Sequence, residues 1–322
     1  QVYRGLDIGT GKLPTHSVIL EGAQRPIESN KSKDSIASLQ NDVIKEKGFW
    51  IIDGVKIWMY DVVSPRIQYT VADYVKDADR VIREIWERPC LPAGRGKLPI
   101  IVGGTGFYLK ALLEGLPNLA VPVDEKLRNK LERLSVEQLQ VRLKKLSQKK
   151  WKGLNESDRG NSRRLVRAVE LTLDRGDRGN KGNQGVGIGI RNCDILKIGL
   201  TASREVLYKN ADQRILSWID QGIIEEAENL YKKGLSLKRI KELGLEYGVL
   251  ADYLQGEIRG IEGDKGLIRV MQAKLHGYVR RQLTWFKNEN SVNWFDIADK
   301  DYINNVEILV SSWYHERNDK TN

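Results

Sequence analysis

The stretch from Lys97 to Gly115, KLPIIVGGTGFYLKALLEG, carries the clearest indication of the fold in this sequence. A short β-rich run, residues 98–102, meets two glycines, and a helical pattern follows up to Gly115. We therefore expect a strand, a tight turn and a helix, which together form the unit of an α/β fold. Ligands of open α/β sheets bind at the carboxyl ends of strands, so this turn is a candidate binding site.

Thr105 stands at the expected N-cap of that helix. A threonine there satisfies free backbone N–H groups, which is a purely structural role. A helix N-terminus can also bind an anion or the polar edge of a ligand. The motif alone is compatible with both roles.

The composition is that of an ordinary globular protein, with 322 residues, 40% hydrophobic and 30% charged. This length predicts one full domain plus a smaller one. The chain contains no apolar run long enough to span a bilayer and no signal-peptide pattern, so we expect no membrane partner. Its two cysteines, Cys90 and Cys193, lie far apart without metal-ligand spacing. We therefore predict a cytoplasmic protein without disulfides and assign no metal-ligating residue.

The N-terminal stretch GLDIGTGKLP has some likeness to a phosphate-binding P-loop. A P-loop requires Gly, four residues, Gly, Lys and then Ser or Thr. Counting back from Gly11 and Lys12, Leu6 stands where the first glycine is needed, and Leu13 stands where the hydroxyl is needed. We therefore interpret this stretch as something other than a P-loop.

Positive charge is concentrated in one part of the chain. The net charge is +10, and residues 126–167 alone hold 14 Lys or Arg against 4 Asp or Glu. The pattern from about 124 to 174 is helical throughout, and the glycine-rich residues 175–192 predict a flexible loop. Such a basic block commonly binds a polyanion, although a solvated helical face would have the same composition.

The second half of the chain predicts mainly helices. Strands are expected in DILKIGL and VNWFDI, and helices at 71–87, 203–220, 222–233, 245–254, 265–287 and 301–315. Within 203–220, Arg214 falls at the edge of an apolar stripe formed by Leu207, Ala211, Ile215 and Trp218. A guanidinium there needs an anionic partner, either an internal carboxylate or a diphosphate.

Two helical stretches present several cations on or near one face. The helix ending HGYVRRQLTWFK has Arg280, Thr284 and Lys287 on one face, and NSRRLVRAVEL does the same with three arginines of the basic block. Cations beside an aromatic edge suit a nucleic-acid backbone and a splayed base. A packed amphipathic helix with a polar face is the alternative for each.

Six motifs in the same order resemble those of the tRNA dimethylallyltransferase (tRNA isopentenyltransferase) family. They are QVYRGLDIGTGK, YTVADY, IIVGGTGFYLKALLEGLP, RRLVRAVEL, RRQLTWF and NWFDI, and they extend from residue 1 to about residue 300. The resemblance implies an α/β fold with a P-loop NTPase-like parallel sheet core and an all-helical insertion that grips the anticodon stem. It also implies three parts: residues 1–117 and 195–322 for the core, and 118–194 for the insertion with its glycine-rich loop.

The resemblance further implies the reaction. The family transfers a dimethylallyl group from dimethylallyl diphosphate to the N6 amine of the adenine beside the tRNA anticodon, releases diphosphate and uses Mg²⁺. It implies that Arg214 contacts the diphosphate and that Thr105 lies beside the adenine. The implied tRNA-binding residues are Gln1, Arg128, Arg163, Arg164, Arg167, Lys241, Gly244, Arg280, Arg281, Gln282, Thr284 and Lys287. We expect a monomer whose partners are the anticodon stem-loop and dimethylallyl diphosphate.

Two departures from the family pattern accompany this resemblance. DIGTGK resembles the segment that follows the family's catalytic Asp, and the P-loop lies further upstream. We therefore expect the catalytic Asp, the first strand and the P-loop to be missing from this chain, and the chain to be inactive alone. Asn210 stands where the family tends to have a second Arg before Arg214, whereas Asp61 retains a family Asp. Two other functions stay open: an adenylate isopentenyltransferase, or an RNA-binding chain without catalysis.

Overall fold

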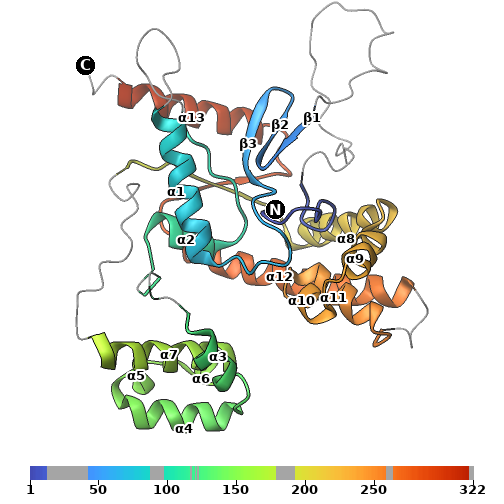
Figure 1. The fold of residues 1–322 in the computed structure, drawn as a ribbon. Coiled ribbons are helices and arrows are strands. Elements are labelled where there is room, and N and C mark those ends of the chain that lie inside the picture. Colours follow the sequence, from blue (N-terminus) through green and yellow to red (C-terminus); the bar gives the residue numbers. More distant parts are fainter. Residues whose placement is uncertain are drawn as a thin grey trace, which may run out of the picture. The chain divides into compact units, whose positions relative to one another are not determined.

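The computed structural model describes residues 1–12, 43–87, 98–116, 118, 119, 121, 123–178, 193–258 and 264–318. They form two compact units (Figure 1). The core unit comprises Gln1–Tyr69, Val81–Gly106 and Asp194–Asn322, and the helical unit comprises Thr70–Arg80 and Phe107–Cys193. The predicted division at 117/118 and 194/195 stays a prediction. Every helix in the described residues is too short or too polar to cross a lipid bilayer.

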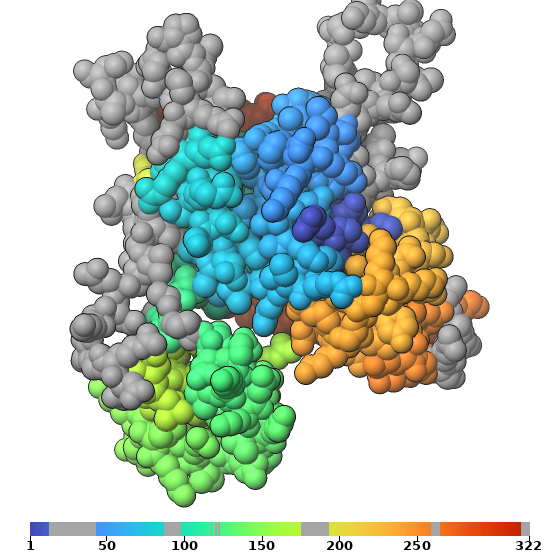
Figure 2. Space-filling model, in the orientation of Figure 1, coloured from blue at the N-terminus to red at the C-terminus, as the bar shows by residue number. Residues whose placement is uncertain are grey.

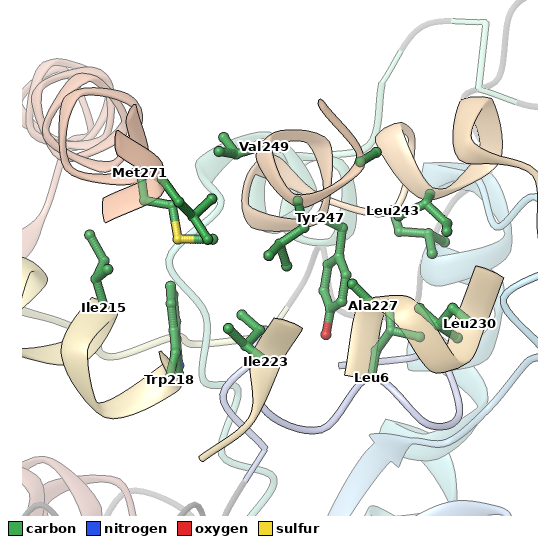
Figure 3. Packing of buried hydrophobic residues seen from close by; sticks show 14 of the residues in the cluster. Leu6, Ile215, Trp218, Ile223, Ala227, Leu230, Leu243, Tyr247, Val249 and Met271 are labelled. Carbon is green, nitrogen blue, oxygen red and sulfur yellow. The ribbon is translucent and has the colours of Figure 1, made fainter. Parts of the chain in front are cut away.

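Most of the predicted helices of the second half are confirmed within the core unit. They are α8 (Arg204–Asp220), α9 (Ile223–Lys232), α11 (Leu245–Leu254), α12 (Asp264–Lys287) and α13 (Tyr302–Asn318), together with a short α10 (Leu237–Lys241) that was not predicted. The stripe predicted on α8 is real, because Ala211, Ile215 and Trp218 are buried. They belong to one apolar cluster that also contains Leu6 and Tyr247 (Figure 3). The cluster therefore ties the N-terminal stretch to helices more than 200 residues later.

The two strands predicted in the second half pair with each other. Strand β4 (Lys197–Thr201) and strand β5 (Val292–Asp296) form a parallel ladder, as an α/β fold requires. The segment that joins them contains helices α8 to α12. A helical crossover of this kind is how parallel strands are connected.

The strand predicted at 98–102 is wrong. These residues are coil, and Ile100 and Val102 are 82% and 90% exposed. A strand requires backbone hydrogen bonds to a neighbouring strand, and in the described part of the chain β4 is paired with β5. An apolar, β-branched composition is therefore insufficient here. The helix after the turn is confirmed as α2 (Gly106–Leu113).

A three-stranded antiparallel sheet was not predicted from the sequence. Its strands are β1 (Val43–Glu46), β2 (Gly48–Ile52) and β3 (Val55–Tyr60). Asp53 and Gly54 join β2 to β3, and both have positive φ, 50° and 77°. Asp-Gly between two β-rich runs is a strong hairpin signal, and it would have predicted this hairpin from the sequence.

The helical unit confirms the predicted all-helical insertion. It contains α3 (Glu125–Leu131), α4 (Val136–Leu146), α5 (Gln148–Lys152), α6 (Glu156–Arg159) and α7 (Ser162–Arg178), which form one green body in Figure 2. Its core is made of leucines and valines of α3, α4 and α7. Residues 175–178, predicted as loop, belong to α7, and 179–192 lie outside the described residues. Helix α1 (Val71–Glu87) has the predicted bounds.

Candidate active site

The N-terminal turn, Asp7–Lys12, is built around a buried lysine. The side chain of Lys12 is 0% exposed, and its Nζ donates hydrogen bonds to Asp7 Oδ1 at 2.8 Å, Asp61 Oδ1 at 2.5 Å and the Tyr3 carbonyl at 2.7 Å. Because all three donors of this ammonium have acceptors in the protein, Lys12 is not available to hold phosphates. This agrees with the interpretation that the stretch is not a P-loop.

The antiparallel sheet supports the same turn through Trp50. Its indole N–H donates to Asp61 Oδ2 at 2.8 Å, and the Lys45 ammonium lies 4.0 Å from the ring centroid. Burial raises the pKa of Asp7, but the hydrogen bonds and charges of Lys12 and Lys45 outweigh burial and hold that pKa below its ordinary value. Asp7 is therefore a carboxylate at neutral pH, and the turn is an ionic cluster with matched charges.

The GGTG loop, residues 103–106, faces one side of helix α12. Thr105 Oγ1 lies 3.4 Å from the Tyr278 hydroxyl, which also lies 3.5 Å from the Gly104 carbonyl. A Cβ on Gly106 would stand 1.9 Å from Trp285 Nε1, so only glycine fits there. Tyr278 and Trp285, seven residues apart, lie on the same helical face. The loop is thus packed closely against that face of α12.

Gln282 lies between those two aromatic residues on the same helical face. Its Oε1 is buried and has no hydrogen-bond partner in the described part of the protein. Buried acceptors without partners are rare in proteins, because each one costs about 1–3 kcal/mol. An unpaired buried oxygen beside the loop is an acceptor available to a bound molecule.

Arg214 is an exposed cation at the rim of the buried stripe. Its guanidinium makes no hydrogen bond or ion pair of its own with the residues that the structure describes. The charge of Arg214 acts on Glu246: burial raises the pKa of that carboxyl, and a backbone hydrogen bond and the charge of Arg214 oppose the shift. Two partners were expected for Arg214, an internal carboxylate or a diphosphate. The internal carboxylate, Glu246, senses the charge of Arg214 but forms no ion pair with it, so the guanidinium is free to bind an anion.

Several predicted RNA-binding residues of the core unit already have partners in the protein. Arg280 Nη1 donates to the Tyr208 hydroxyl at 3.2 Å, and Thr284 Oγ1 donates to the Arg280 carbonyl at 2.9 Å. Lys241 Nζ lies 2.5 Å from Asp252 Oδ1, and this hydrogen bond raises the pKa of the lysine. These bonds leave part of each side chain's donor capacity unused.

Other predicted RNA-binding residues of the core unit lie at helix ends or on exposed faces. Arg281 and Lys287 are exposed on α12, and Gly244 is the N-cap of α11. Gln1 is exposed, and its Nε2 donates to the Gly11 carbonyl at 3.1 Å. Gln1 therefore extends along the N-terminal turn.

A group between α8 and α12 was missed from the sequence. His276 Nε2 lies 2.8 Å from Asp212 Oδ1, and the imidazole stacks on Tyr208 with centroids 4.0 Å apart and planes at 4°. Since 64 residues separate His276 from Asp212, no local pattern could have indicated this pair. Through the hydroxyl of Tyr208, the group also positions Arg280.

In the helical unit, two predicted RNA-binding arginines converge on one buried carboxylate. Glu170 is 5% exposed and accepts two hydrogen bonds of 2.7 Å from Arg128 and one of 3.1 Å from Arg167. Arg167 also donates to the carbonyls of Asn118 and Val121. Their contact with RNA stays a prediction, but the structure gives both arginines a role in holding the helices together.

The other two arginines of this motif are exposed. Arg163 makes no ion pair within the described residues, and Arg164 pairs with Asp158 at the surface. Further cations of the helical unit are exposed and have no ion pair in that part of the chain; among them are Lys126, Lys130, Arg133, Arg142, Lys144, Lys145, Lys149 and Lys152. Much of the positive charge that remains available lies on these side chains.

The described residues contain no group of three or more His, Cys, Asp or Glu side chains that could hold a metal ion. We therefore assign no Mg²⁺ ligand to this part of the chain.

Comparison with known proteins identifies the family of this chain. The family model of IPP transferase matches residues 51–289. A tRNA dimethylallyltransferase of Bacillus cereus (strain AH820) is 30% identical over 301 residues, covering 93% of this chain and 80% of that relative.

Solved structures give the same result for the fold. The full-length tRNA isopentenylpyrophosphate transferase of Bacillus halodurans aligns with a TM-score of 0.57 and 26% identity, covering 100% of this chain and 88% of that one. A eukaryotic dimethylallyltransferase acting on tRNA aligns with a TM-score of 0.60 over 80% of this chain and 65% of that one, at 17% identity, which is a likeness of fold alone. The fold is thus the P-loop NTPase-like α/β fold that the motifs predicted. The chain belongs to the IPP transferase family.

Proposed function

We propose that this protein transfers a dimethylallyl group from dimethylallyl diphosphate to the N6 amine of the adenine beside a tRNA anticodon. Family membership and the name of the Bacillus cereus relative support this reaction. The observation that carries the proposal to particular residues is the GGTG loop packed on α12, beside the unpaired buried oxygen of Gln282.

The loop and α12 would hold the base. The hydroxyls of Thr105 and Tyr278 can donate to or accept from the edge of a base. Gln282 Oε1 can accept a hydrogen bond from a base amine, and this would satisfy an acceptor that now has no partner. A base removed from its stack is read in this way, by hydrogen bonds to its edge and by packing against aromatic side chains.

Arg214 would bind the departing diphosphate. Positive charge develops on the allylic carbon as diphosphate leaves, so the reaction depends on cations that stabilise the anion. The exposed guanidinium of Arg214, without an ion pair in the described residues, is suited to that task. Mg²⁺ would contribute further positive charge to the diphosphate when bound.

RNA binding would rest mainly on exposed cations. In the helical unit these include Arg163, Arg164 and the exposed cations from Lys126 to Lys152, and in the core unit Arg281 and Lys287. Phosphate contacts supply affinity, whereas Gln282 and Thr284 would contact base edges. A cytoplasmic location and a monomeric state complete this proposal.

The proposal is tested by offering two acceptors to the 322-residue chain. An unmodified anticodon stem-loop and free AMP are incubated with dimethylallyl diphosphate and Mg²⁺, and nucleosides are analysed by mass spectrometry. We expect turnover by this chain far below that of a full-length relative assayed in parallel. Any prenyl group that is transferred should be on the adenine of the RNA and not on AMP, because a nucleotide-sized substrate has no need of the basic helical unit. Prenylated AMP without prenylated RNA would favour the adenylate isopentenyltransferase.

A binding titration with the same stem-loop separates the remaining alternative. RNA binding that weakens steeply with salt, without prenyl transfer to either acceptor, would favour an RNA-binding chain without catalysis. Absence of both binding and transfer would contradict the proposed function altogether.

A further inference from the structure

A carboxylate of helix α9 holds the N-terminal turn. Glu226 Oε2 accepts hydrogen bonds from the backbone N–H groups of Asp7 at 2.8 Å and Ile8 at 3.2 Å. Its other oxygen, Oε1, accepts from the hydroxyl of Tyr247, at 2.5 Å. Two consecutive backbone amides on one carboxylate oxygen resemble an anion site, here filled by the protein's own side chain.

Tyr247 fixes the position of that carboxylate. Its side chain is 0% exposed, and burial with the adjacent charge of Glu226 raises the pKa of its phenol, so the hydroxyl stays a donor. The same ring leaves little room above it, because a Cβ on Gly9 would lie 3.0 Å from its Cε2, Cζ and hydroxyl atoms. Figure 3 shows the ring of Tyr247 extending toward Leu6.

The held turn is connected to Gln1 by a short series of hydrogen bonds. The Gly11 N–H donates to the Ile8 carbonyl at 2.9 Å, and the Lys12 N–H donates to the Asp7 carbonyl at 3.0 Å. The Gly11 carbonyl in turn accepts from the side-chain amide of Gln1 at 3.1 Å. The position of the Gln1 side chain therefore depends on the position of residues 7 and 8.

We propose that Glu226 is a positioning residue, which acts with Tyr247 to fix the turn Asp7–Lys12 and through it the side chain of Gln1 for contact with RNA. The proposal rests on the proposed function, because Gln1 matters only if the protein binds RNA. If Glu226 has only a structural role, substituting it should change the stability of the protein equally whether or not the Gln1 side chain is present. A positioning Glu226 would lose its effect on RNA affinity once Gln1 is removed.

Hydrogen exchange tests the turn directly. In Glu226→Ala, we expect the peptide containing the Asp7 and Ile8 amides to exchange about tenfold faster or more, because both amides lose a charged acceptor. Glu226→Gln should restore most of the protection, since its oxygen can accept from the amides while its NH₂ group donates to Tyr247. Glu225→Ala, one residue away and exposed, is the matched control and should exchange like the wild type.

RNA affinity tests the connection to Gln1. Glu226→Ala should weaken binding of an anticodon stem-loop by about two- to tenfold, as expected for one lost hydrogen-bonding contact. In a Gln1→Ala background the same substitution should have no further effect. Tyr247→Phe, which removes only one of the three hydrogen bonds, should give a smaller effect of the same kind and carries the test if Glu226→Ala does not fold.

The outcomes are separable. Unchanged exchange in Glu226→Ala and Tyr247→Phe would overturn the role of Glu226 in the turn. Equal loss of affinity with and without Gln1 would overturn the connection to RNA. If the wild type binds no stem-loop, the proposed function fails, whereas the exchange measurement still decides whether Glu226 holds the turn.

Discussion

The two units of the protein each contain a carboxylate that collects hydrogen-bond donors, and they do so differently. Glu170 of the helical unit binds two arginine side chains, Arg128 and Arg167. Glu226 of the core unit binds two backbone amides and a tyrosine. The first arrangement withdraws positive charge from the surface. The second engages no cation, and it fixes the backbone of the N-terminal turn.

This difference matters for locating an RNA surface from sequence. The motif RRLVR supplies three arginines, yet one of them, Arg167, is held by a buried carboxylate and two carbonyls. Arg163 has no ion pair in the described part of the chain. The count of basic residues therefore overstates the charge that a polyanion can reach, and the paired and unpaired arginines should respond differently to substitution.

The largest expected effect is on stability. Glu170→Ala leaves two guanidinium groups without their carboxylate, and we expect a loss of about 3–5 kcal/mol in the free energy of unfolding of the helical unit. Denaturant unfolding followed by tryptophan fluorescence measures it. Glu132→Ala, an exposed carboxylate of the same unit, is the control and should stay within about 0.5 kcal/mol of the wild type. If Glu170→Ala left the free energy of unfolding unchanged, the distinction between paired and unpaired arginines would fail.

Arg214 extends the comparison to an unpaired cation of the core unit. If it binds the departing diphosphate, Arg214→Ala should lower kcat. The activation free energy should rise by about 2–4 kcal/mol, as on loss of one oxyanion donor. Affinity for the stem-loop should barely change. The exposed Arg204 of the same helix supplies the control substitution, Arg204→Ala. Loss of RNA affinity with unchanged turnover would reassign Arg214 to RNA binding.

The exposed arginines should change the salt dependence of RNA binding. Reversal of Arg163 and Arg164 to Glu should flatten the slope of log affinity against log salt by roughly one unit per lost phosphate contact. Arg167→Gln should instead lower the melting temperature and leave the slope of the folded protein nearly unchanged. Filter-binding titrations at several salt concentrations compare the variants. An equal flattening by Arg167→Gln would mean that this arginine reaches the RNA as well.

The smallest expected effect concerns Glu246. Because burial raises the pKa of Glu246 above its ordinary 4.5, the charged form disfavours folding at neutral pH. Glu246→Gln should therefore raise the melting temperature slightly at pH 7. Below about pH 4 the carboxyl is protonated whether the chain is folded or not, and the difference should vanish. A stabilisation that persists at low pH would show that charge is not its cause.

Sequence reasoning predicted the helices well and the sheets less well. The bounds of α11 agree with the prediction at both ends, because apolar spacing along a helix is a local property. The strand expected at 98–102 failed because pairing depends on a partner elsewhere in the chain. The hairpin at Asp53 and Gly54 was within reach, since its turn signal is local.

The candidate site was predicted by residue type more than by arrangement. Thr105 and Arg214 were identified from a turn and from a helical wheel, and the structure places Thr105 beside Tyr278 and leaves Arg214 exposed. What the sequence could not indicate are the carboxylate partners of the arginines and of Lys12. Asp61 lies 49 residues from Lys12, and Glu170 lies 42 residues from Arg128, so only the folded chain brings them together.

The contact between the N-terminal turn and helix α9 has a consequence for the order of folding during synthesis. Asp7 and Glu226 are 219 positions apart. At the usual rate of about 5–20 residues per second, the ribosome needs roughly 10 to 45 s to produce Glu226 after Asp7 has been made. Residues 6–8 are therefore made long before their final contacts on α9 exist, and Leu6 stays exposed to water, or bound to a chaperone, until its apolar neighbours have been made.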